Sequence, residues 1–236
     1  RSTDPDGNNP LALFASIKKD GGQCIPHHLA ANWGLVSAAT DWDYHDPQVQ
    51  RVVEIFSRHA DYEKYENQSR YTKNILKFER HCAQDALARG YHLGFVAGSD
   101  SHQMEHGVEG GIMAAFVPAL TSENVWNAIY QRFTYGTSGA RILASMTIGT
   151  HHMGEEVLIS AELPVKMEIS VLAVNTIRKI QIIKNNEVLF EIDGDGDAMD
   201  FTVEDAQRSQ EDYYYLRVEQ VDDHCAWCSP IWVRCE

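Results

Sequence analysis

The chain has 236 residues, of which 44% are hydrophobic and 23% charged, as in an ordinary soluble globular protein. Its 34 acidic and 20 basic residues give a formal net charge of −14, and such a surface repels phosphate backbones and anionic lipid. Nucleic acid and membranes are therefore poor candidates for partners. No apolar run reaches the roughly 18 residues of a membrane span and no signal peptide is visible. We expect a soluble protein, and its compartment (cytoplasmic, periplasmic or secreted) stays open.

The chain begins with a polar stretch, Arg1–Pro10, that has no initiator methionine. Such a stretch is typical of a loop inside a longer polypeptide. We therefore expect the sequence to be a fragment, with a possible N-terminal piece of the same polypeptide as a partner. The oligomeric state is left open.

Five cysteines, an odd number, do not make a disulfide framework at this length. A zinc site at Cys225 and Cys228 would need two further ligands, for which His224 and Cys235 are nearby candidates. A disulfide among these cysteines also stays open. Packing cysteines are the preferred interpretation.

Strand and helix patterns alternate over residues 1–140. Pro10–Lys19 has the apolar spacing of a helix, Gln23–His28 that of a short buried strand, and Gln48–Phe56 that of a helix leading into a strand. Tyr71–Arg89 has one apolar helical face, and Gly90 is placed to close that helix.

Three further segments continue this alternation. His92–Gly98 is typical of a buried parallel strand, Gly110–Val117 of another strand, and Ser122–Phe133 of an amphipathic helix capped by Thr121 or Ser122. The order predicts βα units around a parallel sheet or barrel, in a domain of residues 1–140.

From about Arg141 the pattern changes to short strands separated by turns. It predicts an antiparallel β domain of residues 141–236, a sandwich, so that the fold class is α/β followed by all-β. The carboxylates of Asp193–Asp197 invite a calcium site, but the spacing lacks the downstream Glu of the calcium loop, and a solvated hairpin turn is favoured. The strand patterns are Val165–Val174, Ile177–Ile183, Glu187–Ile192, Tyr213–Gln220 and Ile231–Val233.

Asp100 and His102 form the strongest local signal for chemistry. They follow a buried strand, at the carboxyl end where α/β folds gather their sites, and side chains two apart in an extended segment point the same way. A carboxylate with an imidazole suits Mn, Fe or Zn. A turn Asp beside an incidental His is the alternative.

Two more clusters share this position at a strand end. His27 and His28 end the short strand, and only one of them should enter a site because adjacent strand residues point to opposite faces. Glu54 lies in an apolar strand, where a carboxylate is a ligand or orients one by hydrogen bonding, and His59 and Glu63 follow in the next loop. Each cluster alone has an ordinary structural explanation, but three at one face favour a metal site.

The motifs resemble those of PHP-type metallohydrolases, the polymerase-and-histidinol-phosphatase superfamily, in its carbaryl-hydrolase-like (CehA/McbA-type) branch. The resemblance covers nearly the whole chain in order. It is carried by Ile25–His28, Asp41–Pro47, Val53–His59, Gly90–His102 and Arg132–Ile142, and by the terminal segments Tyr213–Val218 and Trp227–Val233.

This resemblance implies the C-terminal part of a distorted (β/α) barrel with a cluster of two or three divalent metal ions (Mn, Fe or Zn), whose bound hydroxide attacks an ester. His27, with His28 as the alternative, matches a metal-binding histidine of the family, and Asp100 and His102 match its final metal motif. Glu54 and His59 match a recurrent motif of less defined role, and we count them with Asp100 and His102 as candidate catalytic residues. The family's opening His-x-His motif has no match here.

The leading hypothesis is a metal-dependent hydrolase that acts on a small-molecule phosphoester, carboxyl ester or carbamate. Four residues are candidates to line its substrate pocket: Arg132, Tyr135, Thr137 and Arg141. The alternative is a non-catalytic β module that binds carbohydrate or protein, attached to a truncated or degenerate barrel. A third possibility is that the β domain only caps the barrel.

Overall fold

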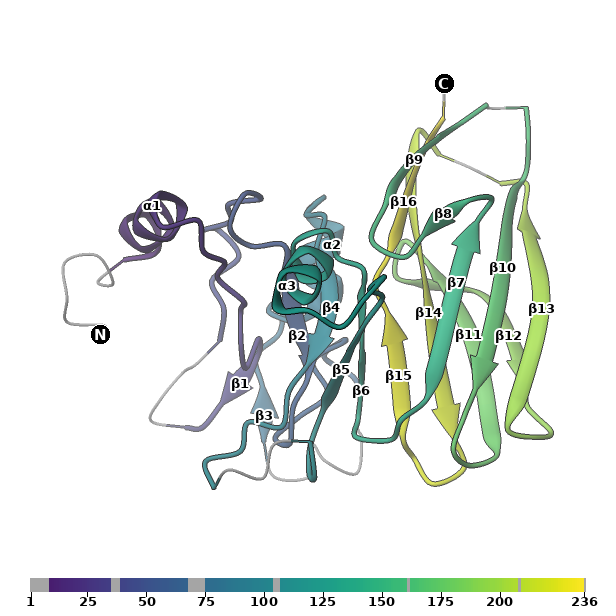
Figure 1. Cartoon of the computed structure of the whole chain (residues 1–236), viewed down its shortest axis with the longest axis horizontal. Helices are drawn as coiled ribbons and strands as arrows, with labels where there is room; N and C mark the ends of the chain where they lie inside the picture. The colour runs from purple at the N-terminus through teal and green to yellow at the C-terminus, as the bar shows by residue number, and fades with distance from the viewer. Residues whose placement is uncertain are drawn as a thin grey trace.

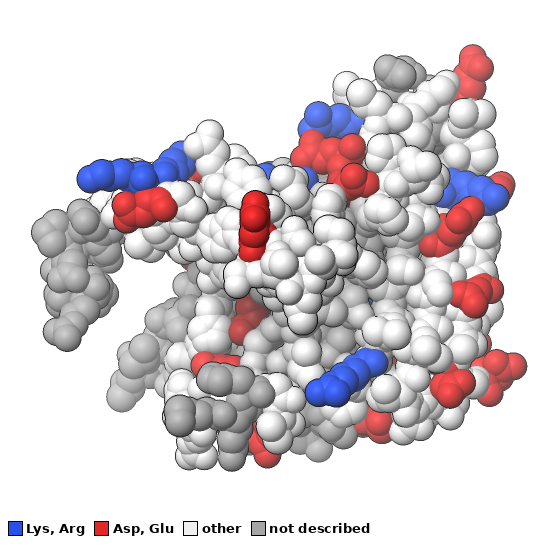
Figure 2. Space-filling view, viewed as in Figure 1, with Lys and Arg blue, Asp and Glu red and all other residues white. Residues whose placement is uncertain are grey.

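The structure, a computed structural model, describes residues 9–34, 39–67, 75–103, 107–160, 162–207 and 209–235. Among the described residues, strands outnumber helices, and a β-sandwich at one end joins an α/β half at the other (Figure 1). Acidic side chains are spread across the face shown in Figure 2. Within the described residues, no helix has the length and apolar character needed to cross a membrane.

The α/β half is built around two parallel strands, β2 (Val52–Phe56) and β4 (Gly94–Ala97). All residues of both strands are buried, as the apolar runs in the sequence predict. The segment before His27 runs beside β2, where the Cys24 amide donates to the Val49 carbonyl and the Glu54 amide to the Pro26 carbonyl. It forms no regular strand, in part because Pro26 has no N–H to donate to a ladder.

Helix α1 (Pro10–Lys19) has the predicted bounds, with Asn9 accepting a hydrogen bond from the Ala12 amide at its start. Helix α3 (Ser122–Tyr130) begins after Thr121, whose hydroxyl accepts from the Asn124 amide. Both predicted helices are confirmed.

The predicted helix Tyr71–Arg89 is wrong over most of its described length. Helix α2 covers only Ala83–Ala88, and its capping box joins Cys82 to Asp85. Upstream of it, β3 (Leu76–Lys77) pairs with β1 (Ala31–Asn32). Tertiary pairing of the backbone therefore overrides the helical spacing of the side chains, while residues 71–74 lie outside the described part.

The helical start of Gln48–Phe56 is also wrong, since only Val52–Phe56 is regular structure. The strand predicted at Gly110–Val117 is confirmed as β5 (Ile112–Ala115).

Two sheets form the predicted sandwich. The smaller has the order β13-β10-β7-β8, and the larger has the order β12-β11-β14-β15-β6-β5, with β16 pairing to β14 and to β9. Their pairings are antiparallel except between β9 and β16. The strands are β6 (Thr134–Thr137), β7 (Leu143–Ile148), β8 (His151–His152), β9 (Glu156–Ile159), β10 (Val165–Leu172), β11 (Ile177–Lys184), β12 (Glu187–Asp193), β13 (Ala198–Asp205), β14 (Glu211–Gln220), β15 (Cys225–Cys228) and β16 (Ile231–Cys235).

The larger sheet includes strands on the N-terminal side of the boundary predicted between residues 140 and 141. Strand β6 pairs with β15, and β5 pairs with β6. The hairpin predicted at Asp193–Asp197 is wrong: this turn passes from β12 in the larger sheet to β13 in the smaller one. The turn packs against the end of the sandwich, where its Gly196 carbonyl accepts from the Ile177 amide.

The larger sheet buries both of its faces. One face packs on the smaller sheet in a core that includes Met167 and Tyr214. The other face sends Tyr215 and Trp227 into a second core shared with β2, β4 and α2. The sandwich and the α/β half are thus joined by a continuous apolar contact.

The cysteines support the packing interpretation. Cys225 and Cys228 are free thiols, and Cys228 is buried in the sandwich core. Among the described residues, the groups spaced to hold a metal ion do not include these cysteines.

Candidate metal centre

Three segments far apart in the sequence meet at one edge of the parallel strands. His27 and His28 follow the segment that runs beside β2, His59 lies in the turn after β2, and Asp100 follows β4. Because β2 and β4 are parallel, their carboxyl ends lie at the same edge. The sequence-based expectation of a strand-end cluster is met by these residues.

Asp100 lies at the centre of this cluster. Its Oδ2 atom is 2.7 Å from Nε2 of His59 and 3.3 Å from Nε2 of His28. Its Oδ1 atom is 3.4 Å from Nε2 of His27 and 3.5 Å from Nε2 of His102. Every ion pair of Asp100 within the described part of the chain is therefore with an imidazole, and none is with a lysine or arginine.

One oxygen of this carboxylate is buried and unsatisfied. Asp100 Oδ2 is inaccessible to solvent and accepts no hydrogen bond from the described residues. A buried carboxylate oxygen without a hydrogen bond or a cationic side chain is costly. A divalent cation would supply the missing charge, and two groups have suitable spacing: His28, His59 and Asp100, and also His27, His28 and Glu54.

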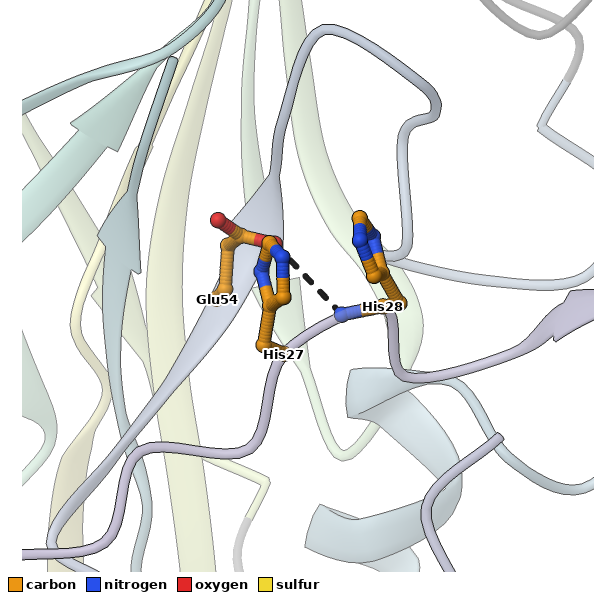
Figure 3. Close-up of side chains that lie close together, drawn as sticks. All are labelled: His27, His28 and Glu54. Atoms are coloured by element: carbon orange, nitrogen blue, oxygen red, sulfur yellow. Dashed lines mark hydrogen bonds and ion pairs between the residues drawn. The ribbon is translucent and has the colours of Figure 1, made fainter. Parts of the chain in front are cut away.

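Glu54 acts on His27. Its Oε2 atom is 2.5 Å from Nδ1 of His27. The same atom accepts a 3.5 Å hydrogen bond from the His28 amide, which ends the dashed line in Figure 3. A carboxylate on Nδ1 leaves Nε2 free to bind a metal, an arrangement that recurs at metal sites. The structure therefore favours the orienting role for Glu54, although its spacing also allows it to be a ligand.

The charges of the two neighbouring histidines differ. Burial lowers the pKa of His27, but Glu54 overcomes this effect and raises it above the ordinary value. Burial and the adjacent His27 imidazole lower the pKa of His28 to about 4. His28 is therefore neutral near pH 7, which is the state in which an imidazole binds a metal.

The backbone at the cluster is strained. His28 and Asp100 adopt left-handed conformations, with φ of 57° and 48°, which cost a non-glycine residue of order 1 kcal/mol. In this conformation, both adjacent histidines reach the cluster, contrary to the expectation that only one would. A Cβ atom at Gly98 would lie 2.8 Å from Oε1 of Glu54, so a side chain there would have to displace that carboxylate.

Two aromatic residues complete the site and were missed by sequence reasoning. The Trp33 ring stands edge-on to His28 and His59, with centroid distances of 4.8 and 5.9 Å. The Tyr62 hydroxyl is 3.4 Å from Nδ1 of His28. Neither belongs to a motif with metal-ligand spacing, so only the fold reveals them.

His102 lies at the rim of the cluster. Its side chain is 85% exposed, whereas that of Asp100 is 11% exposed. His102 is close enough to act with Asp100, but it is not part of either metal-spaced group.

Two of the four predicted pocket residues, Arg132 and Tyr135, have partners away from this cluster. Arg132 is buried against Gly94 at the opposite end of β4 from Asp100, where it donates to the Gly154 carbonyl. Tyr135 donates to the Ile142 carbonyl inside the sandwich core. Their roles in substrate binding stay predictions, as do those of Thr137, which is buried in β6, and Arg141, which is exposed.

No protein-family model matches the chain. An uncharacterized protein of Chlamydia trachomatis is 30% identical, with 79% of this chain and 35% of that protein covered. One of Chlamydia pneumoniae is 29% identical, with 95% of this chain and 40% of that protein covered. The chain thus spans about two fifths or less of the length of these relatives.

Solved structures resemble parts of the chain only distantly. The fibronectin(III)-like modules of CbhA from Clostridium thermocellum are 12% identical, with 40% of this chain and 96% of that chain covered and a TM-score of 0.29. A lytic polysaccharide monooxygenase of Jonesia denitrificans is 12% identical, with 34% and 56% covered and a TM-score of 0.26. At these TM-scores the likeness carries no argument about function.

Proposed function

We propose that this chain supplies His28, His59 and Asp100, together with His27 held by Glu54, to the metal centre of a hydrolase. The observation that carries the proposal is the buried Asp100 Oδ2, which faces imidazole nitrogens and accepts no hydrogen bond from the described residues. The donor set of carboxylate and imidazole suits Mn, Fe or Zn. The substrate class in this proposal is a phosphoester, carboxyl ester or carbamate.

A divalent ion at this place would polarise the scissile ester and lower the pKa of a bound water toward about 7. The chain's own residues have separate tasks. Glu54 fixes the tautomer and direction of His27 through Nδ1. Trp33 stands edge-on to His28 and His59 at the border of the cluster. His102 is exposed beside Asp100, which suits exchange of a proton with solvent.

As part of this proposal, the chain is the C-terminal part of a PHP-type metallohydrolase, which its motifs resemble, and contributes to the barrel of that family. The chain matches 35% and 40% of the lengths of its chlamydial relatives. We propose that the remaining metal ligands of a complete centre come from outside this chain. The centre as a whole would then hold two or three ions.

Metal binding is the first test. Titration of the metal-free chain with Mn²⁺ or Zn²⁺, followed by calorimetry, should show saturable binding that Asp100→Asn weakens by more than about 100-fold, beyond the loss usual for a residue that only orients a ligand. His92→Gln is the matched control, because His92 also faces carboxylates, those of Glu156 and Glu211, outside the cluster. Equal loss in both variants, or no binding by the wild type, would contradict the metal centre.

Hydrolysis is the second test. A metal-loaded protein that combines this chain with the remaining ligands of the centre should cleave chromogenic aryl phosphates, esters or carbamates, and Asp100→Asn should abolish that turnover while it leaves the circular dichroism spectrum unchanged. If the wild type neither binds metal nor cleaves these substrates while its sandwich binds glycans, the non-catalytic β module becomes the better function.

A further inference from the structure

Glu63 connects the candidate metal centre to the sandwich. Its carboxylate is fully buried and accepts hydrogen bonds from the Tyr215 hydroxyl at 2.6 Å, from Arg217 Nη1 at 2.7 Å and from Trp227 Nε1 at 3.1 Å. These three donors come from β14 and β15 of the larger sheet. We call Glu63 and these donors the Glu63 cluster.

The Glu63 cluster holds the end of the turn that carries His59. After β2 the chain reverses, so that Phe56 bridges to Asp61 and the Tyr62 amide donates to the Ile55 carbonyl at 2.7 Å. His59 lies within this reversal, and its amide donates to the Ser57 hydroxyl at 3.3 Å. Only three residues lie between His59 and Glu63, so a displacement of Glu63 changes the path of a short turn.

The start of α2 is tied to the same place. The Gln84 amide donates to the Glu63 carbonyl at 3.0 Å, and the Gln84 side chain donates to the Tyr215 hydroxyl at 2.7 Å. A buried carboxylate must have its charge and lone pairs matched. The Glu63 carboxylate accepts hydrogen bonds from Arg217, Tyr215 and Trp227, and the Arg217 guanidinium also balances its charge. These donors approach from several directions and therefore hold the carboxylate in one position.

We propose that the sandwich sets the position of His59 in the metal centre through the Glu63 cluster, so that Tyr215, Arg217 and Trp227 are positioning residues for a ligand on the other half of the molecule. This inference rests on the proposed metal-binding function. It gives the β domain a role in the centre although none of its residues belongs to the metal-spaced groups among the described residues.

The neighbour of Tyr215 provides a matched control. Tyr214 is equally buried and also donates its hydroxyl to a carboxylate, Asp205, at 2.8 Å. However, it points into the core between the two sheets, on the face away from the metal centre. Tyr215→Phe and Tyr214→Phe therefore remove the same group from the same strand, but only the first removes a donor to Glu63.

The experiment is a titration with Co²⁺, whose visible absorption reports the ligands around the ion. Tyr215→Phe should weaken Co²⁺ binding by about 10-fold, as the loss of residues that orient metal ligands does, and should alter the absorption in the direction produced by His59→Ala. Tyr214→Phe should bind Co²⁺ within about two-fold of the wild type. In a His59→Ala background, Tyr215→Phe should cause no further loss, because its effect passes through His59.

The outcomes separate this inference from the proposed function. If the wild type binds Co²⁺ and the two tyrosine variants bind it equally well, or if Tyr215→Phe weakens binding as much without His59, the positioning role is overturned and the metal centre stands. If the wild type binds no Co²⁺, both are overturned. Should Tyr215→Phe fail to fold, Trp227→Phe removes another donor to Glu63 and should give the same 10-fold loss and spectral change.

Discussion

Carboxylates are buried in two regions of this molecule, but their charges are balanced differently. In the sandwich, Asp205 Oδ2 lies 2.6 Å from Lys184 Nζ and accepts from Tyr214 at 2.8 Å, while Asp212 lies 3.3 Å from the same lysine. At the strand ends of the α/β half, the ion pairs that Asp100 makes with described residues are all with imidazoles, and one of its oxygens accepts no hydrogen bond from those residues.

The difference separates acids whose charge the protein itself balances from an acid whose charge it does not balance. A carboxylate that brings its own ammonium and hydroxyl partners contributes to folding and needs nothing more. A buried carboxylate oxygen that faces imidazoles and accepts no hydrogen bond destabilises the fold unless another group balances its charge. The Asp100 cluster is therefore where a bound cation is expected, and the Lys184 cluster, meaning Lys184 with Asp205 and Asp212, is not.

The largest predicted effect is a stability contrast between the two acids in metal-free protein. Asp205→Asn should lower the free energy of unfolding by roughly 2–3 kcal/mol, because it leaves the Lys184 ammonium with a weaker partner in a buried place. Asp100→Asn should change it by less than about 1 kcal/mol, since a poorly compensated charge is removed. Urea unfolding at pH 7 measures both values.

Similar losses of stability in the two variants would contradict this comparison. The charge of Asp100 would then be balanced within the folded protein to the same degree as that of Asp205, and the buried Oδ2 atom would no longer support a bound cation. Addition of Zn²⁺ sharpens the test further, because it should raise the melting temperature of the wild type and of Asp205→Asn but not that of Asp100→Asn.

A smaller effect is expected at Glu54. Glu54→Gln keeps the shape of the side chain but weakens its hold on Nδ1 of His27, so the metal affinity should fall by about 10- to 100-fold. Glu156→Gln is the matched control, since Glu156 lies 2.9 Å from Nδ1 of His92 outside the cluster. Calorimetric titration of the two variants would contradict the orienting role if both, or neither, lost affinity.

Much of the sandwich could be predicted from the sequence, because its strands carry local signals. Strand β10 alternates strictly between buried and exposed residues, and the Asn185–Asn186 turn adopts the left-handed conformations that asparagine tolerates. The segment Leu76–Lys77 has no local strand signal, and it is a strand only because its backbone pairs with Ala31–Asn32. The helical spacing of the apolar residues in and around this segment therefore predicted the wrong structure.

The candidate site shows the same division. Asp100, His27 and His28 could be found because they follow apolar segments that end in polar residues. Trp33 and Tyr62 could not, because their approach to His28 depends on how distant segments pack. For the same reason, the sequence carries only a weak signal for a role of Glu63, because its hydrogen-bond partners lie more than 150 residues away on the sandwich.

The smallest predicted effect is the pH dependence of the Lys184 cluster. Burial acts to raise the pKa of Asp205, but Lys184, the Gln207 amide and Tyr214 overcome it and hold the pKa below the ordinary value. A carboxyl whose folded pKa lies below its unfolded value of about 3.9 stabilises the fold above that pH, and the contribution is lost as the pH falls through the folded pKa.

The stability difference between wild type and Asp205→Asn should thus be constant above about pH 5 and shrink below about pH 4, because only the wild type takes up this proton. Urea unfolding from pH 7 down to pH 3 measures it. A difference that stays the same at pH 3 would mean that Asp205 acts by shape alone, and the contrast with Asp100 would then not be one of charge.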